Sequence, residues 1–140
     1  MATASTSFRL SERTKRRLTD RAELEGVSAT VLLERLITEG VETLDHPGIV
    51  YRGPAHERRA GLAGGPDVWE VIARLRELPG TEEDRIETLS EETDLHPRQI
   101  RAALEFAASH PDEVEASIGR NDAAIATGRT TAARRRVLLG

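Results

Sequence analysis

The sequence predicts a mainly α-helical protein whose short N-terminal strand pairs with a second copy of the chain. Three observations predict this fold class. Side chains alternate between apolar and polar over residues 6–12, two capped helical patterns follow, and a Gly- and Pro-rich stretch at 45–66 precedes further helical patterns. We therefore divide the chain into an N-terminal unit at residues 1–45, a small helical domain at 46–120 and a basic tail at 121–140.

The stretch from Thr6 to Glu12 has the alternation of a strand with one buried face. Phe8 and Leu10 fall on the apolar face. The polar face consists of Ser7, Arg9 and Ser11. A single terminal strand leaves its backbone unpaired and its apolar face uncovered. Because no later segment is a suitable partner, we expect a two-stranded ribbon between two copies in a swapped homodimer.

Two helices should follow this strand. Ser11 is a good N-cap for a helix from about Glu12 to Glu25, which Gly26 ends, and Ser28 caps a second helix from Ala29 to about Leu44. The second helix has a wide apolar face made of Val31, Leu32, Leu33, Leu36, Ile37, Val41 and Leu44. One neighbouring helix cannot cover a face of this width, which favours burial inside a dimer.

This order of elements resembles the ribbon-helix-helix family of the Arc, MetJ and CopG repressors. The resemblance covers roughly Ser5 to Leu44, and its most specific parts are Phe8–Glu12 and the turn Gly26-Val27-Ser28. It implies a dimer that places an antiparallel ribbon in the major groove of operator DNA. The sequence leaves open whether such dimers associate into higher oligomers.

The resemblance implies that the outward residues of the ribbon, Ser7, Arg9 and Ser11, face the DNA bases. Arg9 can contact O6 and N7 of guanine together, which contributes about 1–3 kcal/mol of base discrimination. The backbone N–H groups at Val27, Ser28 and Ala29 would hold a phosphate at the start of the second helix. Further positive charge would come from Arg13, Lys15, Arg16 and Arg17.

The alternative for Arg9 and its basic neighbours is a solvated surface. Residues 9–21 contain six basic and two acidic residues, whereas residues 22–45 contain one basic and six acidic residues. Positive charge is therefore concentrated where the family places DNA, which favours the DNA-binding interpretation.

The composition limits the remaining function classes. The 140 residues carry a net charge of −4 and no cysteine, which excludes a disulfide scaffold and thiolate chemistry. No apolar run approaches the length of about 18 residues that a membrane helix needs, and no signal-peptide pattern opens the chain. We expect a cytoplasmic protein that makes no contact with a membrane.

In the second region, a short β-hairpin could form from Ile49–Tyr51 and Arg59–Leu62, and four helical patterns follow. These begin near Val68, Thr81, Pro97 and Pro111. The expected inward-facing residues are Val68, Val71, Ile72, Leu75, Ile86, Leu89, Ile100, Ala103, Leu104, Ala107, Val114, Ile118 and Ile125. The helices at 81–90 and 97–109 could form a helix-turn-helix with Arg98 and Arg101 exposed.

This region resembles the bacterial domain-of-unknown-function family 433 over about residues 46–120. The matching blocks are His46–Val50, Arg59–Gly61, Asp67–Ile72, Leu95–Leu104 and His110–Val114. The resemblance implies a helix-turn-helix type of domain that commonly serves as the antitoxin beside a PIN-like ribonuclease toxin. The glycine-heavy loop at 58–66 departs from the more polar turn of many relatives.

Charge argues against DNA as the main partner of this region. Residues 46–119 contain eight arginines and fifteen acidic residues, and such a surface repels phosphate. We expect dimerisation or protein docking instead.

The tail has the opposite charge, with five arginines and one aspartate from Arg120 to Gly140. One interpretation is a solvated helix end. The other is a docking segment, in which arginines pair with the Mg²⁺-binding carboxylates of a PIN-like nuclease and apolar residues bury against it. The expected toxin-binding residues are Arg129, Arg134, Arg135, Arg136 and Leu138. The sequence favours neither interpretation.

We find no catalytic constellation and expect no cofactor and no metal. Three of the four histidines precede proline, which is typical of turns and helix starts, and no pair has the spacing of metal ligands along a helix. Two functions remain. The first is a dimeric, autorepressing antitoxin, and the second is a stand-alone repressor whose second domain senses a ligand or sets the oligomeric state. The acidic domain and the basic tail favour the antitoxin.

Overall fold

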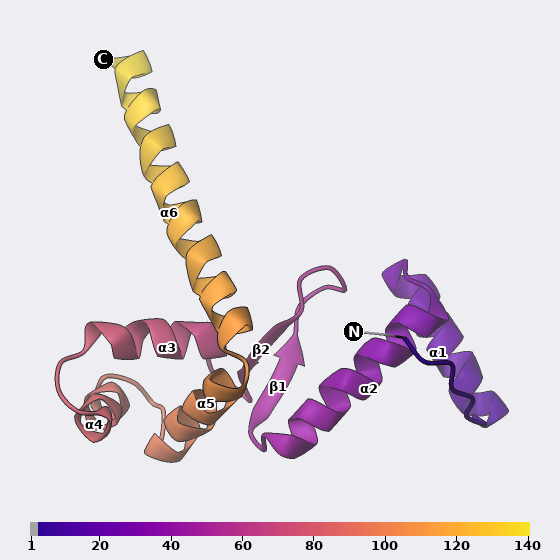
Figure 1. The fold of residues 1–140 in the computed structure, drawn as a ribbon. Helices are drawn as coiled ribbons and strands as arrows, with labels where there is room; N and C mark the ends of the chain where they lie inside the picture. The colour runs from indigo at the N-terminus through magenta and orange to yellow at the C-terminus, as the bar shows by residue number, and fades with distance from the viewer. Residues whose placement is uncertain (1–2) are drawn as a thin grey trace.

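The computed structural model describes residues 3–140, which form a mainly helical structure with one small antiparallel sheet (Figure 1). The expected fold class is confirmed at this level, as is the short β-hairpin. The elements in chain order are α1 (Glu12–Glu25), α2 (Ala29–Asp45), β1 (Ile49–Arg52), β2 (Arg59–Leu62), α3 (Val68–Glu77), α4 (Glu82–Glu92), α5 (Pro97–Ser109) and α6 (Pro111–Leu139).

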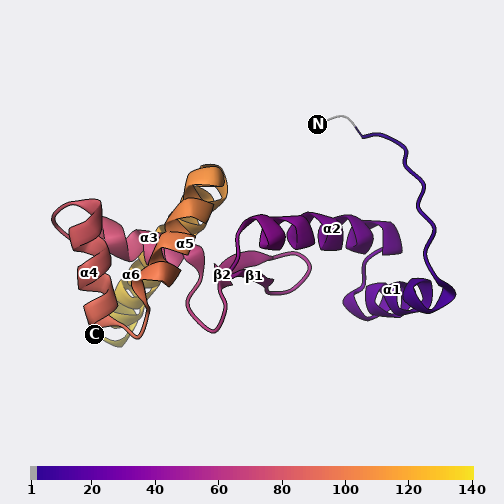
Figure 2. The same cartoon turned by 90° about the horizontal axis from the view of Figure 1, so that it is seen from below.

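The first two helices begin and end where their capping residues predict. The Ser11 hydroxyl accepts a hydrogen bond from the Thr14 N–H, and Gly26 ends α1 in the left-handed region at φ 70°. The Ser28 hydroxyl accepts from the Val31 N–H and caps α2. Residues 3–10 pair with no strand of the described chain, and Figure 2 shows them as an extended segment that leads into α1. The intermolecular ribbon therefore stays a prediction.

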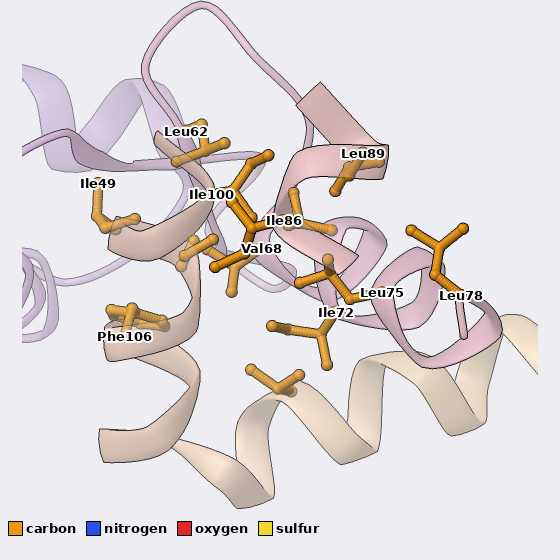
Figure 3. Close-up of a cluster of buried hydrophobic side chains, with 14 residues drawn as sticks. Ile49, Leu62, Val68, Ile72, Leu75, Leu78, Ile86, Leu89, Ile100 and Phe106 are labelled. Carbon is orange, nitrogen blue, oxygen red and sulfur yellow. The ribbon is translucent and has the colours of Figure 1, made fainter. Parts of the chain in front are cut away.

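The main core lies in the second region, where the hairpin, α3, α4, α5 and the start of α6 pack together (Figure 3). Phe106, Ile100 and Ala103 of α5 are fully buried at its centre. Leu104 and Ala107 are half-buried and pack against this core as expected, but the prediction omitted Phe106, which is fully buried. Ile125 was also wrong as a core residue, since α6 has already left the core at that point and the side chain is exposed.

A buried carboxylate joins the hairpin to α3. Asp67 accepts hydrogen bonds from Arg52 Nε at 2.9 Å, Arg59 Nε at 2.7 Å and Trp69 Nε1 at 3.3 Å. Arg52 also donates to the carbonyls of Leu62 and Gly65, which fixes the loop after β2. Burial acts to raise the pKa of Asp67, but the bonds from Arg59 and Arg52 hold it below its ordinary value.

The glycine-heavy loop follows from this arrangement. The Arg52 guanidinium lies directly over Gly61, where a Cβ would overlap it. Gly64 adopts a positive φ of 68°, which side chains rarely tolerate. The glycines therefore build a tight turn beneath an arginine.

Replacing Asp67 by asparagine should lower the free energy of unfolding by about 2–3 kcal/mol at pH 7, because two arginines lose their charge partner. The pKa of Asp67 is lower in the folded protein than in the unfolded chain, where it is about 3.9. The carboxylate therefore contributes to the free energy of unfolding above the unfolded pKa, and this contribution is lost as the pH falls through the folded pKa. Urea unfolding at pH 7 and pH 3 checks both statements. Asp94→Asn, at an exposed position, is the matched control; equal effects of the two changes would refute the assignment.

Helix α6 is continuous across residue 120, so the expected tail extends the helix to Leu139. Val114 is buried and Ile118 half-buried against the core, whereas residues 122–139 are exposed. Figure 1 shows this part of α6 projecting away from the other elements. In the part of the chain that the structure describes, no helix has the length and apolar composition needed to cross a membrane.

Candidate nucleic-acid interface

The predicted DNA-binding residues of the N-terminus are all exposed to solvent. They are Ser7, Arg9, Ser11, Arg13 and Lys15. The Ser11 hydroxyl is already used in part, since it donates to Thr14 Oγ1 at 2.9 Å and accepts from the Thr14 N–H at 3.1 Å. Its capping role leaves one lone pair for a further contact, so Arg9 and Ser7 remain the fully available side chains of the polar face.

The cations at and before the start of α1 form no ion pair within residues 3–140. Among the described residues, no carboxylate forms an ion pair with Arg9, Arg13, Lys15, Arg16 or Arg17. The next arginine along the helix, Arg21, lies 3.4 Å from Glu25. Positive charge at the start of α1 is therefore available for an external anion.

The structure reduces the expected phosphate site at the start of α2 from three backbone N–H groups to two. The Val27 N–H donates to the Ala22 carbonyl at 3.0 Å to close the end of α1, so it is not free to bind a phosphate. Within residues 3–140, the N–H groups of Ser28 and Ala29 have no protein acceptor. These two N–H groups lie at the positive end of the α2 dipole.

An uncovered apolar surface extends over the same unit. Phe8 is 79% exposed and Leu44 is 80% exposed, although both are large hydrophobic residues. Other exposed apolar side chains of this unit are Leu24, Val31, Leu36, Ile37 and Val41. A groove between α1 and α2 continues the surface and is lined by Leu10, Leu18, Leu24, Leu33 and Leu36 among others. Contiguous apolar surface of this kind marks an interaction site.

An ion-pair chain connects this unit to the hairpin. Arg35 of α2 contacts both carboxylate oxygens of Glu25 at 3.1 Å, and Arg58 contacts Glu39 at 2.6 Å. Burial acts to raise the pKa of Glu25, but Arg35 and Arg21 lower it further than burial raises it. Glu25 of α1 and Glu39 of α2 are thus each paired with an arginine.

The second region offers fewer free cations. Arg101 of α5 lies 2.8 Å from Glu83 of α4, whereas Arg98 is exposed and forms no ion pair in the described chain. Arg74 and Arg76 are also paired with glutamates. In the described chain, the expected helix-turn-helix therefore has two arginines without an ion pair, Arg98 and the half-buried Arg85, whose Nε donates to the Gly80 carbonyl.

The predicted toxin-binding residues lie at the far end of α6. All are exposed, and Leu138 is 83% exposed. The members are Arg129, Arg134, Arg135, Arg136 and Leu138. Both views place this helix end far from α1 and α2 (Figures 1 and 2). Unpaired cations therefore gather at the start of α1 and, far from it, at the end of α6.

The histidines have the local roles that their prolines indicate. His96 caps α5 by accepting from the Arg98 N–H at 3.0 Å, and His46 ends α2. The fold also brings His46 close to His110, between α5 and α6, with Glu42 beside both. The sequence analysis missed this cluster, because its members are separated by up to 68 positions along the chain.

Comparison with protein-family models, curated proteins and solved structures finds no match for this chain.

Proposed function

We propose that the protein is a cytoplasmic antitoxin of a type II toxin–antitoxin system, which binds operator DNA as a homodimer and inhibits a PIN-like ribonuclease toxin. The observation that supports this proposal most is the combination found in the N-terminal unit. Unpaired cations and an alternating strand-like segment lie beside an apolar surface that the chain itself leaves open.

A second copy of the chain would account for both the strand-like cationic segment and the open apolar surface. Pairing of two N-terminal segments would satisfy their backbone groups and turn Phe8 and Leu10 toward the apolar surface of α2. Ser7 and Arg9 would then face outward on a two-stranded ribbon, a shape that fits the major groove. The N–H groups of Ser28 and Ala29 would contact a phosphate at each edge.

The toxin-binding part of the proposal rests on the end of α6. A helix that extends beyond its core is marginally stable alone, and packing on a partner would stabilise it. Its unpaired arginines suit a carboxylate-lined nuclease site, and Val137 to Leu139 supply apolar area for burial. A stand-alone repressor has no comparable use for this end.

Replacing Arg9 by alanine should weaken operator binding about 10- to 100-fold and relax base preference at one position in each half-site, because a bidentate guanine contact is lost. The measurement is an electrophoretic mobility shift on the chain's own promoter DNA, combined with selection from a random DNA pool. Arg98→Ala removes an equally unpaired arginine from the acidic region and should change neither result. Unaltered affinity and preference in Arg9→Ala would refute the ribbon assignment.

A further inference from the structure

Three metal-ligand side chains converge where α2 ends and α5 meets α6. Glu42 lies in the last turn of α2, His46 follows as the C-cap of that helix, and His110 joins α5 to α6. The Glu42 carboxylate lies 3.2 Å from His110 Nε2 and 3.8 Å from His46 Nε2. The three ligand atoms all lie within 4.8 Å of one another. A tetrahedral zinc ion with bonds of about 2.0–2.1 Å needs ligand atoms about 3.3 Å apart, so the observed spacing requires only small side-chain movements.

The orientation of His110 suits metal binding. Its Nδ1 lies 3.1 Å from the Phe106 carbonyl oxygen. A carbonyl can only accept a hydrogen bond, so a hydrogen bond at this contact requires the proton on Nδ1 and leaves Nε2 as the nitrogen that faces Glu42. A backbone carbonyl bound to the remote nitrogen is the usual second contact of a metal-bound histidine, since it fixes the tautomer and the ring direction.

Packing holds both rings in place before any ion binds. The His110 ring stacks on Phe106 at 4.2 Å between centroids, and the His46 ring meets Phe106 edge-on at 5.3 Å. Phe106 is fully buried, so its position is set by the core. The ligand side chains are themselves mostly enclosed, with 16% of His46, 22% of His110 and 28% of Glu42 exposed. The site would therefore lose little side-chain entropy on binding.

The surroundings of the three ligands are negatively charged. Burial raises the pKa of Glu113, and the nearby carboxylates Glu42 and Glu39 raise it further while His110 lowers it. Burial and the carboxylates of Glu113, Glu42 and Glu39 also raise the pKa of the Tyr51 hydroxyl. Arg58 compensates the charge of Glu39, so Glu42 and Glu113 are the carboxylates here without an arginine partner, and they favour a cation.

We propose that Glu42, His46 and His110 form a binding site for a divalent transition metal of the zinc class, with water as the fourth ligand. Two imidazoles and one carboxylate match the ligand preference of zinc better than that of Mg²⁺ or Ca²⁺, which favour oxygen. The ion would link the end of α2 to the α5–α6 junction and so couple the proposed DNA-binding unit to the second region. The site itself does not depend on the proposed function.

Titration of Zn²⁺ into the full chain, purified without a histidine tag, tests this proposal by competition with a chromophoric chelator. One Zn²⁺ per chain should bind, the midpoint of thermal unfolding should rise, and Co²⁺ should give the visible absorption of a four-coordinate site. His110→Ala and Glu42→Gln should each weaken binding at least about 100-fold. Circular dichroism without metal verifies that each variant is folded, and Glu42→Gln keeps the side-chain volume if His110→Ala fails to fold.

His56→Ala is the matched control, because His56 is exposed and lies in the loop between β1 and β2. This variant should bind Zn²⁺ as the wild-type chain does. The proposal is overturned if the wild-type chain binds no Zn²⁺, since the three residues then form only an ion-pair cluster. It is also overturned if His56→Ala and Glu42→Gln lose affinity equally.

Discussion

Replacing Ile37 by aspartate should dissociate the proposed homodimer and abolish operator binding while the single chain stays folded. Ile37 lies in the middle of the uncovered apolar surface of α2 and is 52% exposed in the single chain. A carboxylate there costs little in a monomer, but two symmetry-related carboxylates would be buried in the dimer. We expect the dimer to weaken by about 4 kcal/mol, or roughly a thousandfold in its dissociation constant.

Sedimentation equilibrium over a range of chain concentrations measures this effect directly. Thr38→Asp adds the same charge at the next position, which is exposed but not part of the apolar surface, and should leave the dimer intact. Urea unfolding of the Ile37→Asp chain establishes that it is folded. A dimer that survives Ile37→Asp, or a wild-type chain that is monomeric, would contradict the ribbon between two copies.

Removing residues 129–140 should abolish neutralisation of the toxin and leave operator binding unchanged. This end of α6 is exposed throughout and contains four of the unpaired arginines, so its loss does not disturb the core. Without it, the proposed contacts to the acidic nuclease site and the apolar burial of Val137 to Leu139 are lost. Growth of cells that express the toxin, with the wild-type or shortened chain, measures neutralisation; a mobility shift measures DNA binding.

A second variant separates charge from length. Replacing Arg134, Arg135 and Arg136 by glutamine keeps the helix and removes three of the four positive charges at its end. If the arginines pair with carboxylates, this chain should neutralise as poorly as the shortened one. Full neutralisation by the shortened chain would show that the end of α6 is only a solvated helix.

Much of the fold was predictable because local signals were strong. Ser11, Gly26 and Ser28 set the bounds of α1 and α2, and Thr81 with Asp84 forms the capping box that begins α4. The hairpin was predictable from glycines and prolines that flank two short apolar runs. The core face of α5 was harder, because Leu104, Phe106 and Ala107 are close in sequence and the packing of the surrounding elements decides which is fully buried.

The candidate sites differ in how far sequence could predict them. Exposure of Arg9 and its neighbours followed from charge and alternation, since these signals are local. That the Val27 N–H is used to close the end of α1, and so cannot bind a phosphate, could be learned only from the geometry of the turn. The approach of Glu42 and His46 to His110 depends on how α2 packs on the α5–α6 junction, which no local pattern reports.

The antitoxin proposal is tested most directly by growth of a host that expresses the open reading frame adjacent to this one, with and without this chain. We predict that the neighbour alone arrests growth and that co-expression of this chain relieves the arrest. A harmless neighbour, or an arrest that this chain does not relieve, would contradict the antitoxin function.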